Sequence, residues 1–136
     1  MPLHLIKLCV GVESVDELAA WRAEQKSTGH GPVVHTRNTP KRAVEVLEGG
    51  SLYWVIKRQV RCRQLITAVN TLDDGLRTRC ELSLHDELVL VEPRGKTPFQ
   101  GWRYLAHHEA PMDLDSGVGA ELPYEMAVQL RALGAW

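Results

Sequence analysis

Basic side chains in the middle of the sequence carry its clearest chemical signal. The stretch 49–64, GGSLYWVIKRQVRCRQ, begins as an apolar run and ends in a basic one that includes Lys57, Arg61 and Arg63. If 51–69 forms one strand, these side chains share a face on which successive positions lie about 6.8 Å apart. Like charges this close repel, so a phosphate backbone would stabilise the row. The stretch predicts a nucleic-acid surface; the alternative is an edge strand that its charges protect from aggregation.

A second basic group and a set of aromatic side chains extend this prediction. Arg37, Lys41 and Arg42 surround the start of an expected helix over 40–48, whose positive dipole end favours an anion. Aromatic and amide side chains can stack on an unpaired base and hydrogen-bond its edge. The candidates of this kind are Tyr53, Trp54, Gln64, Gln100, Trp102 and Arg103. Solvation of the cations and core packing of the aromatics are the alternatives.

The distribution of charge is consistent with a local positive patch. The net charge of the 136 residues is −1. Residues 37–79 hold nine lysines and arginines against four acidic residues, a local charge of +5, and the remainder holds seven against thirteen, or −6. A domain with a basic middle can therefore attract an anionic partner without being basic overall.

Sequence patterns for the common catalytic and metal sites are missing. The serine of GGSLY has no second glycine two residues later, as a lipase-type nucleophile requires. His107, His108 and Glu109 are adjacent, so they would point to opposite faces of a strand, and no C-x-x-C or H-E-x-x-H occurs. Cys62 lies among arginines but on the apolar phase of its strand. We therefore expect no catalytic residue among these and no metal or other cofactor.

Capping and periodicity predict the elements of the first third. The range 3–12 is apolar on both faces, as in a central strand. Ser14 and Glu17 form a capping box that starts a helix near Val15. Trp21 lies on the same side of this helix as a leucine, which favours a core position.

The rest of the chain predicts a second short helix followed by strands. Thr39 and Pro40 are suited to begin the helix over 40–48, and Gly49 to end it. The strand 51–69 follows, then a turn at 73–75. Later strands are expected in 76–84, 87–93 and 101–108, and a closing helix in 123–134. We expect one α+β domain over 1–136, with a mostly antiparallel sheet that could close into a small barrel and about three flanking helices.

Several strings of the sequence carry a family resemblance. They are LHLIKLCVG, HTRNTPKR, GGSLYWVIK, RQ at 63–64, and PFQGWRYL with the AP and DL that follow. In this order they resemble a family of short bacterial proteins catalogued as domain of unknown function 1489. The resemblance runs from Leu3 to about Leu114 and more loosely through the last helix. It implies membership but no activity.

A looser, architectural likeness is to the PUA-like superfamily, which includes ASCH and EVE domains. This likeness implies a small barrel with short helices that binds RNA or a modified base. It also leaves open an enzyme that acts on a modified nucleoside, as an ASCH-like amidohydrolase would. Groups for that chemistry could come from Thr36, Thr39, Lys41, Glu45 and Lys57.

Partners and location complete the expectations. We expect RNA more than DNA as partner and no membrane. A protein-interaction or structural role is the other alternative, and the closing helix, with Met126, Leu130 and Trp136, could form a homodimer. Three widely spaced cysteines are unsuited to a disulfide framework and favour a cytoplasmic location.

Overall fold

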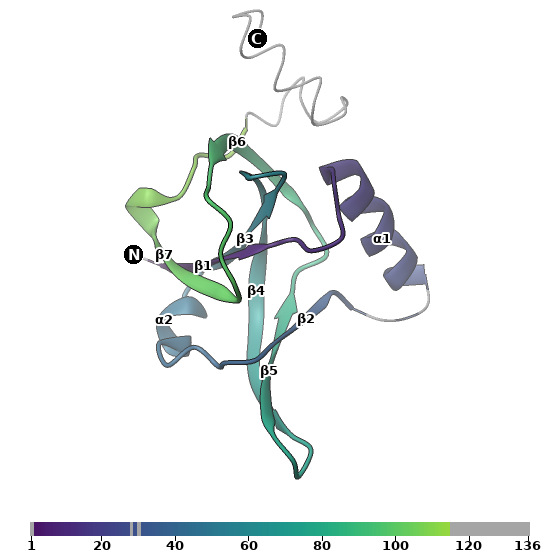
Figure 1. Ribbon diagram of the computed structural model, residues 1–136, viewed down its shortest axis with the longest axis vertical. Helices are drawn as coiled ribbons and strands as arrows, with labels where there is room; N and C mark the ends of the chain where they lie inside the picture. The colour runs from purple at the N-terminus through teal and green to yellow at the C-terminus, as the bar shows by residue number, and fades with distance from the viewer. Residues whose placement is uncertain (1, 28, 30, 115–136) are drawn as a thin grey trace, which may run out of the picture.

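The computed structural model describes residues 2–27, 29 and 31–114, which form one seven-stranded mixed sheet with two α-helices (Figure 1). The strand order is β2-β5-β4-β3-β1-β7, and β6 pairs with β4. Only β1 and β3 pair in parallel; all other pairings are antiparallel. The elements are β1 (Leu3–Leu8), α1 (Val15–Ser27), β2 (Val33–Thr36), α2 (Ala43–Val46), β3 (Ser51–Ile56), β4 (Gln59–Asp73), β5 (Thr78–Leu84), β6 (Val89–Gly95), β7 (Trp102–Ala106) and a 3-10 turn, η1 (His107–Glu109).

The α+β class and the mostly antiparallel pairing are confirmed, but the sheet is not closed into a barrel. Strand β4 explains this, because it belongs to two parts of the sheet. Its first half pairs with β3 and β6, whereas its second half, from Ile66 onward, pairs with β5 and extends away as a long hairpin (Figure 1). The expected third helix, over 123–134, lies outside the described residues.

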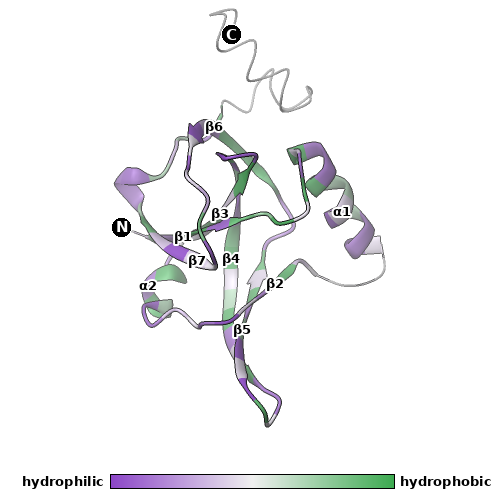
Figure 2. Cartoon of the chain, viewed as in Figure 1, coloured by the Kyte–Doolittle hydropathy of each residue, from purple (hydrophilic) through white to green (hydrophobic). Residues whose placement is uncertain are grey.

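Both faces of β3 are buried, and its alternate residues enter two separate cores. Leu52 and Trp54 pack with side chains from α1 and α2 in the larger core. Tyr53 and Val55 face the other way, into a smaller core with Ile6. Hydrophobic residues accordingly concentrate in the central strands, whereas the β4–β5 hairpin is more hydrophilic beyond them (Figure 2).

The predicted helix α1 begins at its capping-box residues, although Glu17 Oε2 accepts from the backbone N–H of Glu13 at 3.2 Å rather than from that of Ser14. The backbone N–H of Glu17 donates to Ser14 Oγ at 3.1 Å, and Leu18 is fully buried. The expectation that Trp21 is core is wrong, because 47% of its surface is exposed. At about 100° per residue, Trp21 lies about 60° around the helix from Leu18, on the side away from the buried Val15 and Arg22.

The two glycines of the opening stretch have different roles. Helix α2 is shorter than expected, since it spans four residues and its N-cap is Arg42, while Thr39 bonds Thr71 instead. Gly49 follows the helix with φ +100°, a conformation that favours glycine. A Cβ on Gly50 would collide with the backbone oxygens of Leu3 and Val46. Only glycine at position 50 therefore lets the chain pass from α2 into β3, which pairs with β1.

Candidate nucleic-acid surface and polar pocket

The predicted basic row does not form, because 51–69 is a hairpin and not one strand. Lys57 and Arg58 are the two turn residues, with φ of 51° and 65°, as in the type I′ turns that suit hairpins. Arg61 is the extra residue of a β-bulge, since Val55 pairs with Val60 and Trp54 with Cys62. The turn and the bulge reset the alternation, and Arg61 is buried with Nη2 donating to Gln59 Oε1 at 3.0 Å.

Two further candidates hydrogen-bond each other inside the protein. The indole Nε1 of Trp54 donates to Gln64 Oε1 at 3.0 Å, and Gln64 Nε2 donates to the carbonyl oxygen of His85 at 2.9 Å. Gln64 is fully buried and Trp54 nearly so. These contacts satisfy the polar atoms that burial would otherwise leave unpaired, which is a structural role.

Three arginines converge on one small pocket of 180 Å³ at the β4–β5 hairpin. Arg37 comes from the segment after β2, Arg77 immediately precedes β5, and Arg79 lies at the start of β5. His35, Thr36 and Thr78 complete the lining, which contains no acidic residue within the described chain. Arg77 and Arg79 were not among the predicted site residues. The available signal was their alternation in LRTRCEL, which places both on one face of β5.

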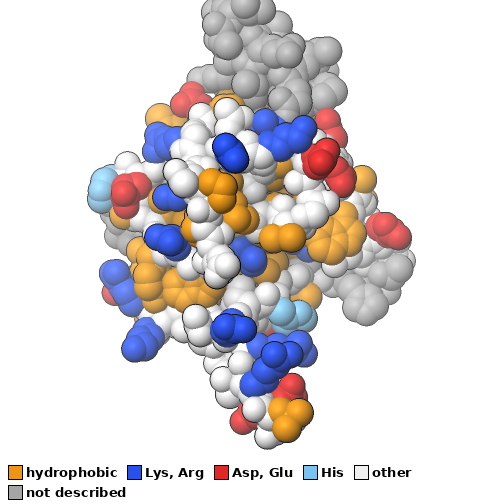
Figure 3. Space-filling model, in the orientation of Figure 1, with side chains coloured by type: hydrophobic (Ala, Val, Ile, Leu, Met, Phe, Trp, Pro, Cys, Tyr) orange, Lys and Arg blue, Asp and Glu red, His pale blue; other side chains and the backbone are white. Residues whose placement is uncertain are grey.

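Aromatic side chains continue this surface across the neighbouring β7. Trp102 Nε1 donates to the carbonyl oxygen of Asn38 at 2.8 Å, and the rings of Trp102 and Tyr104 meet edge to face at 4.9 Å. The Arg42 guanidinium lies 5.7 Å from the Tyr104 ring, and its backbone N–H donates to the phenol oxygen at 3.1 Å. The basic–aromatic surface comprises Arg37, Lys41, Arg42, Arg77, Arg79, Trp102 and Tyr104. In Figure 3, Lys and Arg side chains surround a hydrophobic patch over α2 and β7.

The remaining candidates lie apart from this surface. Arg103 alternates with Trp102 on β7, so it points to the opposite face, where its guanidinium lies 5.2 Å from the Phe99 ring. Gln100 is exposed in the loop before β7. Within the surface, Arg42 also forms an ion pair with Glu45, which partly neutralises it.

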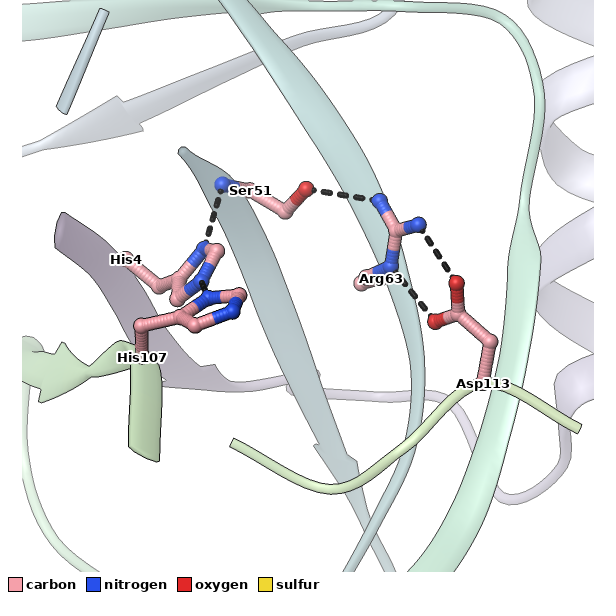
Figure 4. Close-up of polar contacts among 5 residues, drawn as sticks. All are labelled: His4, Ser51, Arg63, His107 and Asp113. Carbon is pink, nitrogen blue, oxygen red and sulfur yellow. Dashed lines mark hydrogen bonds and ion pairs between the residues drawn. The ribbon is translucent and has the colours of Figure 1, made fainter. Parts of the chain in front are cut away.

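A polar pocket of 540 Å³ lies on the Tyr53 face of the sheet. Figure 4 shows the polar contacts among five residues at this pocket, His4, Ser51, Arg63, His107 and Asp113. The polar core of the pocket comes from β1, β3, β4 and the segment after β7, which are distant in the sequence. The lining residues are Pro2, His4, Gly49, Tyr53, Arg63, His107, His108, Ala110, Pro111, Met112 and Asp113.

His4 is held as a neutral imidazole with one defined tautomer. The backbone N–H of Ser51 donates to His4 Nδ1 at 2.9 Å, so this nitrogen must keep its lone pair. The proton is therefore on Nε2, which donates to His107 Nδ1 at 2.9 Å. Burial, with positive charge nearby, lowers the pKa of His4 to about 4. The pair can position a polar ligand, and His107 is its exposed member.

Arg63 is fully engaged in the same pocket. Its Nε and Nη2 donate to the two carboxylate oxygens of Asp113, each at 2.7 Å, and Nη1 donates to Ser51 Oγ at 2.9 Å. This bidentate pair raises the pKa of Arg63, and burial raises the pKa of Tyr53. Ser51 is buried beneath the guanidinium and is unsuited to nucleophilic attack.

The groups considered for nucleoside chemistry do not gather at one pocket. Thr36 Oγ1 donates to the carbonyl oxygen of Asn38, and Lys57 lies at the tip of the β3–β4 hairpin. Among the described residues, no cluster of three or more side chains could hold a metal ion. No helix in that same part of the chain is long and apolar enough to span a membrane.

Comparisons with known proteins support one assignment. Neither the curated proteins nor the solved structures include a significant match, so the likeness to PUA-like domains gains no support. A family model described as "Protein of unknown function (DUF1489)" matches residues 5–136. This is nearly the whole length, and it agrees with the resemblance carried by strings such as GGSLYWVIK. The chain therefore belongs to the DUF1489 family.

Proposed function

We propose that this protein binds single-stranded nucleic acid, RNA more than DNA, through the basic–aromatic surface. The convergence of Arg37, Arg77 and Arg79 on one pocket carries the proposal. Three guanidinium groups repel one another, and no carboxylate lines that pocket; the exposed Asp74 at the hairpin turn interacts with Arg79 from outside it. A phosphate group removes the repulsion and accepts hydrogen bonds from the guanidinium donors.

The aromatic part of the surface supplies a place for a base. Tyr104 is 37% exposed, and Trp102 is half-buried beside it. A base stacked against such a ring gains about 1–3 kcal/mol whatever its identity. Arg37 and Asn38 are consecutive, and Asn38 contacts Trp102, so phosphate and base contacts lie within reach of a short single strand.

A cytoplasmic location belongs to the same proposal. Cys9, Cys62 and Cys80 are free thiols and all three are buried, as is usual for proteins of a reducing compartment. The predicted homodimer helix lies outside the described residues, and self-association stays a prediction.

The test is fluorescence anisotropy of labelled single-stranded RNA and the matching DNA, across a salt series. We expect micromolar binding at low salt for the wild type. The variant Arg37→Ala/Arg77→Ala/Arg79→Ala is expected to bind at least tenfold more weakly. Its log–log salt slope should fall by about 2, because each phosphate contact on a single strand contributes about 0.7.

A matched control removes the same charge elsewhere. Lys57→Asn/Arg58→Gly/Lys96→Ala removes three cations around the β3–β4 turn, where Lys96 N–H donates to the Arg58 carbonyl oxygen at 2.8 Å. This variant should retain most of the affinity. Equal losses in both triple variants would indicate non-specific attraction, and no binding by the wild type at low salt would refute the proposal.

A further inference from the structure

A third pocket lies on the Trp54 face of the sheet, opposite the polar pocket, between α1 and the strands β1, β2 and β3. It has a volume of 400 Å³, within the usual range for small-molecule sites. Two tryptophans and one arginine dominate its lining. The lining residues are Lys7, Leu8, Cys9, Val10, Trp21, Arg22, Gln25, Val33, Val34, His35 and Trp54.

The arginine of this pocket is buried without a carboxylate. Arg22 is 5% exposed, and its only hydrogen bond to a described residue runs from Nη1 to Gln25 Oε1 at 2.8 Å. Its Nε is buried and has no hydrogen-bond partner in the described part of the chain. A buried charge of this kind is costly unless something pairs with it, and each unused buried donor adds to that cost.

Neighbouring groups do not neutralise Arg22. Burial raises the pKa of Cys9 to about 11 and that of Cys62 to about 12, so both nearby thiols are uncharged at neutral pH. No aspartate or glutamate appears among the described lining residues, and Lys7 adds a second positive charge. The lining residue His35 is hydrogen-bonded to Glu81 at 3.0 Å, which engages that carboxylate with the imidazole and not with Arg22. The pocket is therefore electropositive.

The walls favour a ligand with a flat apolar part. The Arg22 guanidinium lies 5.2 Å from the Trp21 ring and 5.7 Å from the Trp54 ring. Trp54 is buried, whereas Trp21 is half exposed, an unusual position for so large an apolar ring. A planar group that covered Trp21 would bury this ring and shield the cation beside it.

We propose that this pocket binds a small organic anion in which a carboxylate or phosphate is joined to a flat ring. The anionic group pairs with Arg22, and the ring lies against Trp21. Arginine suits this role because its planar fork matches both oxyanions. The proposal is independent of nucleic-acid binding, because Arg22 and Trp21 are not part of the basic–aromatic surface; the linings of the two pockets share His35.

The test uses three probes of similar shape in ¹H–¹⁵N NMR titrations. Benzoate and phenyl phosphate carry the two candidate anions, and benzamide is the uncharged counterpart. For the better anion we expect saturable shifts of the Trp21 and Trp54 indole signals, with a Kd on the order of 1 mM for a ligand this small. Benzamide should bind at least tenfold more weakly. The indole signal of Trp102 reports any binding of these probes to the basic–aromatic surface, so it distinguishes that binding from binding beside Arg22.

Substitutions of Arg22 complete the test. Arg22→Met should weaken anion binding at least tenfold, and Arg22→Lys should weaken it less because the charge remains. Should the methionine variant fail to fold, the lysine variant and benzamide still distinguish binding that depends on the Arg22 guanidinium from binding of the ring alone. The proposal is refuted if wild type shows no saturable shift with either anion, if benzamide binds as well as they do, or if folded variants bind unchanged.

Discussion

Two arginines on opposite faces of one sheet have different surroundings: Arg22 is buried, whereas 24% of the Arg63 side chain is exposed. Arg63, on the Tyr53 face, donates to both oxygens of Asp113 and to Ser51 Oγ. Arg22, on the Trp54 face, has two aromatic rings and an amide around it but no carboxylate from the described chain. The pairing raises the pKa of Arg63, whereas desolvation lowers that of Arg22. A satisfied cation stabilises its surroundings, whereas an unsatisfied buried one is a candidate for binding a ligand.

The largest expected effect is the pH dependence of stability that His4 causes on the Arg63 face of the sheet. The pKa of His4 is about 4 in the folded protein and about 6.5 when unfolded, so the unfolded chain binds the extra proton between these values. The contribution of His4 to stability is complete above about pH 7 and falls as the pH drops, by about 3 kcal/mol at pH 4.

The matched variant is His4→Asn, whose side-chain oxygen can still accept from the Ser51 N–H but does not titrate. Urea unfolding at pH 7.5 and pH 4 should show a smaller acid loss in this variant than in the wild type. Equal losses would mean that His4 is not held neutral by its surroundings.

The next effect comes from removing the satisfied arginine. Arg63→Met leaves the buried hydroxyl of Ser51 without its donor and Asp113 without its partner. We expect a loss of about 2 kcal/mol in the free energy of unfolding, moderated because Asp113 is partly exposed to water. Arg103→Met, at an exposed position, is the control and should change stability by less than about 0.5 kcal/mol. Similar losses of stability in Arg63→Met and Arg103→Met would show that the contacts of Arg63 with Asp113 and Ser51 do not stabilise the fold.

The same substitution on the other face should have the opposite sign. Arg22→Met removes a buried charge that lacks a carboxylate and replaces it with an apolar chain of similar length. We expect a gain of about 1 kcal/mol, because replacing buried charges by hydrophobic residues is often stabilising. Thermal and urea unfolding without added anions measure it. A loss as large as that of Arg63→Met would show that Arg22 is structural.

The smallest effect concerns the two exposed cations of the β3–β4 turn. Lys57 and Arg58 adopt positive φ in the β3–β4 turn, which strains residues with a side chain. Lys57→Asn/Arg58→Gly supplies the residues that type I′ turns favour and should stabilise the fold by about 0.5–1 kcal/mol. A destabilised variant in urea unfolding would indicate that these side chains make contacts that support the fold.

Local signals in the sequence predicted the elements that local interactions control. The capping box at Ser14 started α1, the DDG sequence at 73–75 turned the chain, and Gly49 followed the second helix with positive φ. The β3–β4 turn was not predicted, because Lys57 and Arg58 are not typical turn-forming residues. The bulge at Arg61 in β4 was not predicted either, because it has no sequence signature. The turn and the bulge changed which side chains of 57–64 face the core and which face the solvent.

The candidate sites were predicted less completely than the elements. Arg37, Arg42 and Trp102 do lie on one surface, as their types suggested, but Arg77 and Arg79 join them only because the β4–β5 hairpin returns to β2. Trp54 and Gln64 were expected to meet a base and instead bond each other. Residue type alone cannot distinguish a hydrogen bond to a ligand from one to the core.

The sequence by itself determined the family, the α+β class, the first helix and a basic middle region, because these follow from local residue types and their order. Only the tertiary structure decided which charges are satisfied. Arg63 meets a carboxylate fifty residues further along the chain, whereas Arg22 meets tryptophan rings. Pairing across such separations depends on how the sheet brings distant strands together, and no local propensity encodes it.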